Sequence, residues 1–269
     1  MNACRQGMLG AALVLCVAAA SAPAFSVASA AEPASELRFV ACPIYRDTDA
    51  GRKSGCWLAD NPEDGLRYDV TRSPTKPDWN RAILVEGRVS AGQANTCGGI
   101  VLEPVRVSLL AEDCTRAMLP AETYPGIAFV LPARNVRPIH EAREIPAPPF
   151  ATRSFHVPFD HGSDFIVYQL GDYYTNQAVL YAHDTQARRI EITGWAATTP
   201  ITVSGRTLAE PAGLAQSRAD MIAQWLVMSG IDAGRIVVKA ASRDQAADIE
   251  GADGLRDSSR RRVDIVVIP

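Results

Sequence analysis

The sequence predicts an α+β protein, in which a C-terminal α/β sandwich of βαβαββ type follows a small, mostly β part held by disulfides. Three observations favour this fold class. Residues 81–89 and 100–109 alternate between apolar and polar side chains, as strands do. Every cysteine beyond residue 30 lies in the first half of the chain. In the second half, an amphipathic helix at 214–229 stands between alternating segments, which favours layered α/β packing.

Residues 1–30 have the features of a secretory signal peptide. Arg5 gives a basic start, the apolar run 8–20 is too short to span a bilayer, and Ala28-Ser29-Ala30 has the form of a cleavage site. We therefore expect export to the periplasm, with outer-membrane association as a further option. The alternative is an uncleaved N-terminal anchor, but no stop-transfer pattern follows the apolar run.

Composition excludes several classes of function. A hydrophobic fraction of 47% is ordinary for a globular protein, and a net charge of −3 gives no reason to expect a nucleic-acid partner. The sequence shows no nucleophile elbow, no paired carboxylates in a helix-loop context and no zinc-ligand spacing. We therefore predict a non-enzymatic protein without a cofactor or a metal.

The four cysteines of the mature chain predict two disulfides, because an even number in an exported protein is typical of a disulfide framework. Four cysteines allow three pairings, and the sequence alone cannot choose among them. We favour the pairings that close short loops, which are Cys42–Cys56 and Cys97–Cys114. A metal site is the rival interpretation, although no C-x-x-C spacing or nearby histidine supports it.

A proline-rich segment separates two halves of different character. Its prolines cannot lie in a helix interior or a central strand, so 131–152 is expected to be a linker. The prediction is then a small β-rich domain over 31–130 and a second domain over 153–269. The alternative is a surface loop within a single domain. Within the first half, Trp57 and Trp79 fit either strand packing or ligand stacking.

The second half predicts six elements. They are a strand at 154–159, a helix at 167–185, a strand at 189–194, a helix at 214–229, and strands at 236–240 and 262–268. In the first helix one apolar face is expected to hold Leu170, Tyr173, Ala178, Tyr181 and Ala182. In the second helix the apolar face is expected to hold Leu214, Met221, Ile222, Trp225 and Leu226.

Five segments of this half, in order, resemble the OmpA-like, peptidoglycan-associating domain. They are Phe155–Ser163, Ile190–Gly194, Leu214–Ala219, Gly230–Ile236 and Arg261–Ile265. The third resembles the family's L-S-x-x-R-A helix start, and the fifth its closing N-R-R-V-E-I. The resemblance covers about 115 residues, and leaves the first half unassigned. It implies the α/β sandwich and a ligand, the stem peptide of peptidoglycan, usually held at diaminopimelate.

The same resemblance implies a charge pair for the ligand, and the sequence keeps only one member of it. The family supplies an Asp after the second strand and an Arg from the second helix, because Arg pairs with a carboxylate through two parallel hydrogen bonds. Arg218 matches the Arg, whereas Ala197 replaces the Asp and Pro211 replaces an Asn. The site is therefore degenerate, or another carboxylate takes over. Glu210, in an unusually long loop, is the nearest candidate, and Asp220 is second.

Two further groups of residues offer weaker hypotheses. A basic cluster before the last strand, which includes Arg261 and Arg262, could meet anionic ligands or simply stabilise loops. His156, His161, Asp160 and Asp164 are close in sequence but lie on a strand and a turn, where side chains point in different directions, so no metal site is predicted.

Two functions compete. The first is a periplasmic protein of the cell envelope that associates with peptidoglycan through a degenerate diaminopimelate site, formed by Arg218, Glu210, Ala197, Arg261 and Arg262. The second is an OmpA-like fold that no longer binds the cell wall and serves as a protein-interaction module, with an envelope protein as a partner of the N-terminal half. An enzyme is the third class, and no motif supports it.

Overall fold

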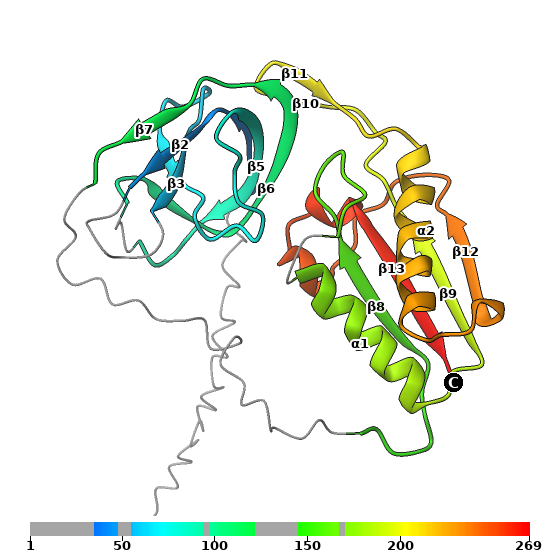
Figure 1. Cartoon of the computed structure of the whole chain (residues 1–269). Helices are drawn as coiled ribbons and strands as arrows, with labels where there is room; N and C mark the ends of the chain where they lie inside the picture. The colour runs from blue at the N-terminus through cyan, green and yellow to red at the C-terminus, as the bar shows by residue number, and fades with distance from the viewer. Residues whose placement is uncertain (1–34, 48–54, 94–96, 122–144, 167–169) are drawn as a thin grey trace, which may run out of the picture. The chain divides into compact units, whose positions relative to one another are not determined.

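The predicted fold class is confirmed by the computed structural model, which describes residues 35–47, 55–93, 97–121, 145–166 and 170–269 (Figure 1). Residues Ala34–Pro269 belong to one compact unit. The predicted signal peptide lies outside the described residues, as does most of the proline-rich segment, so the signal peptide and the domain boundaries stay predictions. Among the described residues, no helix combines the length and the apolar character needed to cross a membrane.

The N-terminal half is a single curled sheet of seven strands (Figure 1). The strand order is β1-β5-β6-β4-β3-β2-β7. The strands are β1 (Leu37–Ala41), β2 (Pro43–Arg46), β3 (Cys56–Asp60), β4 (Arg67–Asp69), β5 (Arg81–Val89), β6 (Ile100–Asp113) and β7 (Ala117–Leu119). Because the sheet curls, side chains from distant strands meet in one core, among them Phe39, Tyr68, Ile83 and Val107.

Both predicted disulfides are present among the described cysteines, but the favoured pairing was wrong. Cys42 pairs with Cys114, with a Cα–Cα distance of 5.7 Å, and Cys56 pairs with Cys97 at 6.0 Å. The reason is the topology of the sheet. Parallel pairing of β2 with β7 brings together the chain segments that follow Cys42 and Cys114. Short sequence separation is a poor guide when strands distant in sequence pair.

The C-terminal half has the predicted βαβαββ order. Its main elements are β8 (Arg153–Pro158), α1 (Leu170–Asp184), β9 (Arg189–Gly194), α2 (Gly213–Met228), β12 (Ile236–Ala240) and β13 (Arg262–Ile268). The sheet order is β12-β9-β13-β8, and only β9 and β12 run parallel. Both helices lie over the same face of the sheet (Figure 1), and they share one apolar core with it. Short 3-10 turns are η2 (Ala233–Arg235), η3 (Glu250–Ala252) and η4 (Ser258–Arg260).

Two details of this half differ from the sequence prediction. Tyr173 was placed on the apolar face of the first helix, but it is 47% exposed, whereas Ala178, Tyr181 and Ala182 are buried. No regular element was among those predicted for the long loop between β9 and α2. It forms a hairpin of β10 (Ile201–Val203) and β11 (Arg206–Leu208), turned by Ser204 and Gly205 at positive φ.

Candidate functional site

The candidate site is centred on Arg218, which lies in the second turn of α2 and is fully buried. A guanidinium has five N–H donors, and all five are used inside the chain. Three go to the main-chain oxygens of Ser163, Trp195 and Asp160, at 2.8, 2.9 and 3.1 Å. The other two go to the carboxylate of Glu210, at 2.9 and 2.6 Å. No donor of Arg218 is left for a ligand.

Glu210 is the carboxylate that the sequence singled out as the nearest replacement for the missing Asp. Its side chain is also fully buried, and it meets Arg218 through two parallel hydrogen bonds. Each carboxylate oxygen accepts one more bond, from the Gly162 amide at 2.8 Å and from the Ala197 amide at 2.7 Å. Four hydrogen bonds therefore hold this carboxylate in place.

The long loop explains how Glu210 reaches Arg218. After the β10–β11 hairpin the chain returns to β9, and the Glu210 amide donates to the Ala197 carbonyl at 2.9 Å. Pro211 then precedes α2, at the helix start where its fixed φ and missing N–H are tolerated. The return of the loop places a carboxylate beside the position where the family resemblance implies an Asp.

The electrostatics of the pair favour two charged side chains. Burial by itself raises the pKa of Glu210, but the hydrogen bonds and charge of Arg218, with the charge of Arg261 and the Ala197 amide, bring that pKa below its ordinary value. His161 lies at the edge of the pair, with its Nδ1 3.9 Å from Glu210 Oε1. Burial lowers the pKa of His161, and the charge of Arg261 lowers it further.

Comparisons with known proteins found matches among solved structures only. No protein-family model matches the sequence, and no curated protein matches it either. Solved OmpA-like structures are similar to this chain. The OmpA-like domain of FopA1 from Francisella tularensis is 19% identical, covers 44% of this chain and 73% of its own, and gives a TM-score of 0.34. Residues 153–269 themselves form the α/β sandwich that the OmpA-like resemblance implies.

Two other solved structures have the same kind of similarity. The peptidoglycan-associated lipoprotein from Burkholderia pseudomallei is 21% identical and covers 42% of this chain and 89% of its own, with a TM-score of 0.33. The cell wall anchor of the T6SS from Pseudomonas aeruginosa is also 21% identical, covers 44% of this chain and 81% of its own, and has a TM-score of 0.33. These identities are too low to transfer a ligand or a partner to this chain.

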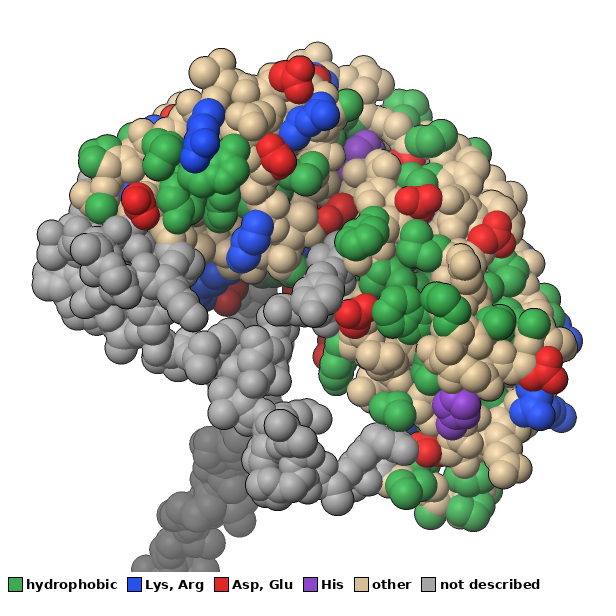
Figure 2. All heavy atoms as spheres, viewed as in Figure 1, with side chains coloured by type: hydrophobic (Ala, Val, Ile, Leu, Met, Phe, Trp, Pro, Cys, Tyr) green, Lys and Arg blue, Asp and Glu red, His purple; other side chains and the backbone are tan. Residues whose placement is uncertain are grey.

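Three of the four arginines of the predicted basic cluster, Arg260, Arg261 and Arg262, are buried and internally paired, whereas Arg256 is exposed. Arg261 is 2% exposed and forms an ion pair with Glu86 of β5. Arg262 donates to Asp264 at 2.9 Å and lies over the ring of Trp195, 4.3 Å from the ring centroid. On the face shown in Figure 2, basic side chains are interspersed with acidic and apolar ones and form no continuous patch. The cluster is thus placed to stabilise loops, which was the second of the two interpretations.

The histidine and aspartate group does not converge on one point. His156 contacts Asp264, with its Nδ1 2.7 Å from a carboxylate oxygen, and Asp164 accepts from the Ser217 hydroxyl at 2.6 Å. Asp160 instead accepts from the hydroxyl of Thr75 in the N-terminal half, at 2.6 Å. The directions differ, as expected for residues on a strand and the following turn.

Sequence reasoning missed the contributions of the backbone and of one buried acid. The carbonyls of Asp160, Ser163 and Trp195 hold Arg218, and carbonyls leave no mark on residue type. Glu86 was also missed, although it carried a signal. It is the only acid in the apolar strand 81–89, and a carboxylate buried there requires a partner.

Proposed function

We propose that this protein is a non-enzymatic, exported protein of the cell envelope, whose OmpA-like half acts as an interaction module and does not take a stem-peptide carboxylate at Arg218. One observation carries the proposal: Glu210 occupies the Nη1–Nη2 edge of Arg218, main-chain carbonyls take its other three donors, and both side chains are fully buried. This favours the second of the two functions considered from the sequence over diaminopimelate binding at this site.

A ligand carboxylate would have to compete with Glu210 for Arg218. A free carboxylate must displace Glu210, which would leave a buried charge without its partner, and breaking a buried pair in this way costs about 3–5 kcal/mol. The intramolecular carboxylate also has no association entropy to overcome, whereas a ligand does. Ligand binding at Arg218 is therefore strongly disfavoured as long as the loop holds Glu210 in place.

The test is co-sedimentation with isolated sacculi. Arg218→Met/Glu210→Leu removes both charges together, so neither side chain is left unpaired. We expect this double variant and the wild type to sediment to the same small extent. If the wild type binds strongly and the double variant does not, the site at Arg218 binds the wall and the proposal is wrong. Circular dichroism of the double variant establishes that the fold is retained.

A second arm attempts to restore the family arrangement. Glu210→Ala/Ala197→Asp removes the internal occupant and returns an acid to the position that the resemblance implies. We expect this variant to bind sacculi more strongly than the wild type. Ala197→Asp alone is the matched control, and we expect no gain from it, because Glu210 still occupies Arg218 and the Ala197 amide already donates to its carboxylate.

The N-terminal half offers a surface for an envelope protein partner. Tyr45, Trp57 and Trp79 form a half-buried aromatic cluster with ring centroids 4.6–5.0 Å apart, and the Arg116 guanidinium lies 3.9 Å from the centroid of the Trp79 ring. Aromatic residues and arginine are enriched at protein interfaces. Met118 pairs with Tyr45 across β2 and β7 and is 51% exposed.

Site-specific photo-crosslinking in living cells tests this surface. A crosslinker at Met118 is expected to capture one defined envelope protein, and Trp79→Ala should abolish that product. A crosslinker at Val237, on β12 of the other half and 40% exposed, is the control. The same product from both positions, or one that survives Trp79→Ala, would contradict the assignment.

A further inference from the structure

Strand β5 is buried on both faces. In a sheet with one face in water, buried and exposed residues alternate along each strand, and β5 does not show that alternation. Ile83 and Val85 point into the core of the N-terminal half and are fully buried. The opposite face carries Ala82, Leu84 and Glu86, which are 2%, 0% and 0% exposed. Something outside the N-terminal core must therefore cover this second face.

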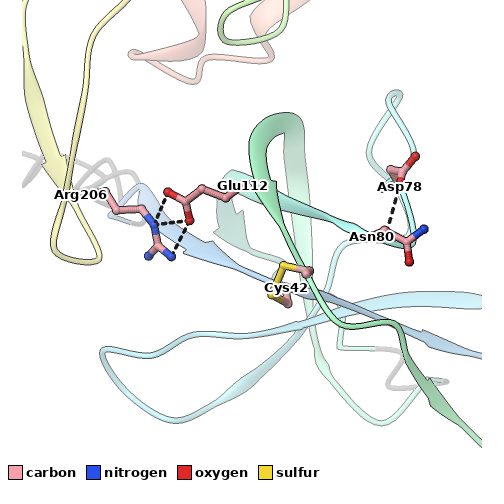
Figure 3. The surroundings of a disulfide bond; sticks show 6 residues. Cys42, Asp78, Asn80, Glu112 and Arg206 are labelled. Atoms are coloured by element: carbon pink, nitrogen blue, oxygen red, sulfur yellow. Dashed lines mark hydrogen bonds and ion pairs between the residues drawn. A yellow bond between two sulfur atoms is a disulfide. The ribbon is translucent and has the colours of Figure 1, made fainter.

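The apolar end of the second face is covered by the β10–β11 hairpin. Val203 of the hairpin shares a buried cluster with Val40, Ala82 and Leu84. The Val40 amide donates to the Ser204 hydroxyl at 3.0 Å. Arg206 pairs with Glu112 of β6, as Figure 3 shows beside the Cys42 disulfide, with N–O distances of 2.8–2.9 Å. This hairpin belongs to the same loop that delivers Glu210 to Arg218.

The charged end of the second face forms a row across three strands. Arg38 of β1 is opposite Glu86 of β5, and Glu86 is opposite Arg106 of β6. The segment 253–261 of the C-terminal half meets each of these charges with its opposite. The pairs are Arg38 with Asp257, Glu86 with Arg261, and Arg106 with Asp253, the last at 3.9 Å.

The same face also contacts the turn that builds the Arg218 site. The His161 amide donates to the Ser108 hydroxyl of β6 at 2.8 Å, and beside the face Thr75, in the segment between β4 and β5, donates to the Asp160 carboxylate. On its other side this turn gives the Asp160 carbonyl to Arg218 and the Gly162 amide to Glu210. The turn is thus held between the N-terminal sheet and the buried ion pair.

We propose that the β1-β5-β6 face is a built-in lid of the OmpA-like half, and that its docking keeps Glu210 on Arg218. The lid holds both segments that the ion pair needs, since it binds the hairpin loop that leads to Glu210 and the turn 160–163. Opening of the lid loosens both segments and makes Arg218 available. This inference rests on the proposed function, because it concerns regulation of the same site.

Amide hydrogen exchange followed by NMR on the full mature chain tests the lid without any cell-wall ligand. Glu86→Gln removes the central charge of the row. We expect exchange of the His161, Gly162 and Ala197 amides to accelerate about tenfold or more, while the Ile192 amide in the central strand β9 keeps its rate. Asp60→Asn, which breaks an exposed ion pair with Arg67 in the same half, is the matched control and should alter none of these rates.

Ser108→Ala is the second variant, because Glu86→Gln leaves Arg261 buried without its partner and could unfold the chain. Ser108→Ala removes only the hydroxyl that accepts the His161 amide. We expect faster exchange at His161 and, to a smaller extent, at Gly162. If Gly162 and Ala197 keep their rates in both variants, or if Ile192 accelerates by the same factor as they do, the lid does not control the site and the proposal is overturned.

The exchange test and the sacculus test have independent outcomes, and each can contradict one proposal without the other. Strong wall binding that depends on Arg218 would contradict the proposed function, whatever the exchange rates are. Unchanged exchange at Gly162 and Ala197 would contradict the lid, even if the wild type binds no sacculi.

Discussion

Glu210→Gln probes the ion pair with the smallest possible change of shape. The substitution keeps the volume of the side chain and leaves one side-chain oxygen as an acceptor, but it removes the negative charge. Arg218 then stays buried, with main-chain carbonyls and an amide oxygen as its only partners. Neutral acceptors satisfy its hydrogen bonds but not its charge.

The magnitude follows from the burial of both partners. Removing one partner of a buried pair costs about 3–5 kcal/mol. For a folded unit of this size, each kcal/mol corresponds to about 2–4 °C in Tm, so a decrease of roughly 6–20 °C is expected. An exposed pair gives a much smaller effect. Asp60 and Arg67 form two hydrogen bonds of 2.6 and 2.8 Å at the surface, and Asp60→Asn should cost at most about 1 kcal/mol.

Thermal unfolding followed by circular dichroism measures both variants against the wild type. The double variant Arg218→Met/Glu210→Leu completes the set. It removes both charges, but it also takes their partners from the Gly162 and Ala197 amides and from three main-chain carbonyls, so it should unfold below the wild-type temperature. Our reasoning fails if Glu210→Gln and Asp60→Asn lower Tm by similar small amounts. That result would mean that the Glu210 carboxylate is hydrated and free to leave Arg218.

Three further predictions follow from particular contacts. Peptide mapping without reduction should give no free thiol in the mature chain and two crosslinked peptides, joining Cys42 to Cys114 and Cys56 to Cys97. The pKa of Glu210 is lowered in the folded protein. The charge of Glu210 therefore stabilises the fold above the unfolded pKa of about 4.3, and this stabilisation is lost as pH falls through the folded pKa. The Tm difference between wild type and Glu210→Gln should shrink below about pH 4. Gly194→Ala would place a Cβ 1.8 Å from the Ala215 carbonyl oxygen of α2, so it should lower Tm far more than Gly213→Ala, where a Cβ meets no atom within 4 Å.

The regular elements of the C-terminal half could be predicted well because each one follows a simple period. The strands at 189–194, 236–240 and 262–268 have the predicted bounds, and the helix predicted at 214–229 is displaced by one residue. The error at Tyr173 has a physical cause. A helix that covers a sheet buries only a narrow stripe, and an aromatic ring at the margin of that stripe can point to solvent.

The arrangement of the N-terminal half could not be predicted in the same way. Alternation indicated the strands β5 and β6, but pairing between distant strands decides which cysteines meet, and no local pattern encodes it. The lack of alternation in the burial of β5 has a similar origin. The second layer that covers its outer face comes from a hairpin and from the segment 253–261, both more than 100 residues later in the sequence.

At the candidate site the sequence identified the two charged partners but not their role. Arg218 was selected because it matches the cation of a ligand-binding motif that the sequence resembles. Glu210 was selected because the acid of that motif is missing. The structure brings them together, but as each other's partner. The residue types indicate a pair of opposite charges, whereas the completeness of the hydrogen bonding around them depends on backbone carbonyls that the sequence does not reveal.

The presence of Arg218 has an energetic explanation that needs no ligand. An arginine in the second turn of α2 is buried by the turn at 160–163 and by Trp195, so its charge has to be balanced inside the fold. Once the long loop supplies Glu210, an acid at position 197 would bring a second negative charge against a single cation. Ala197 and the buried Glu210 therefore fit together, and the Arg218–Glu210 pair serves as a structural contact. The same loop reaches the β1-β5-β6 face through Val203 and Arg206, so one loop contributes both to the internal pairing of Arg218 and to the contact with the N-terminal half.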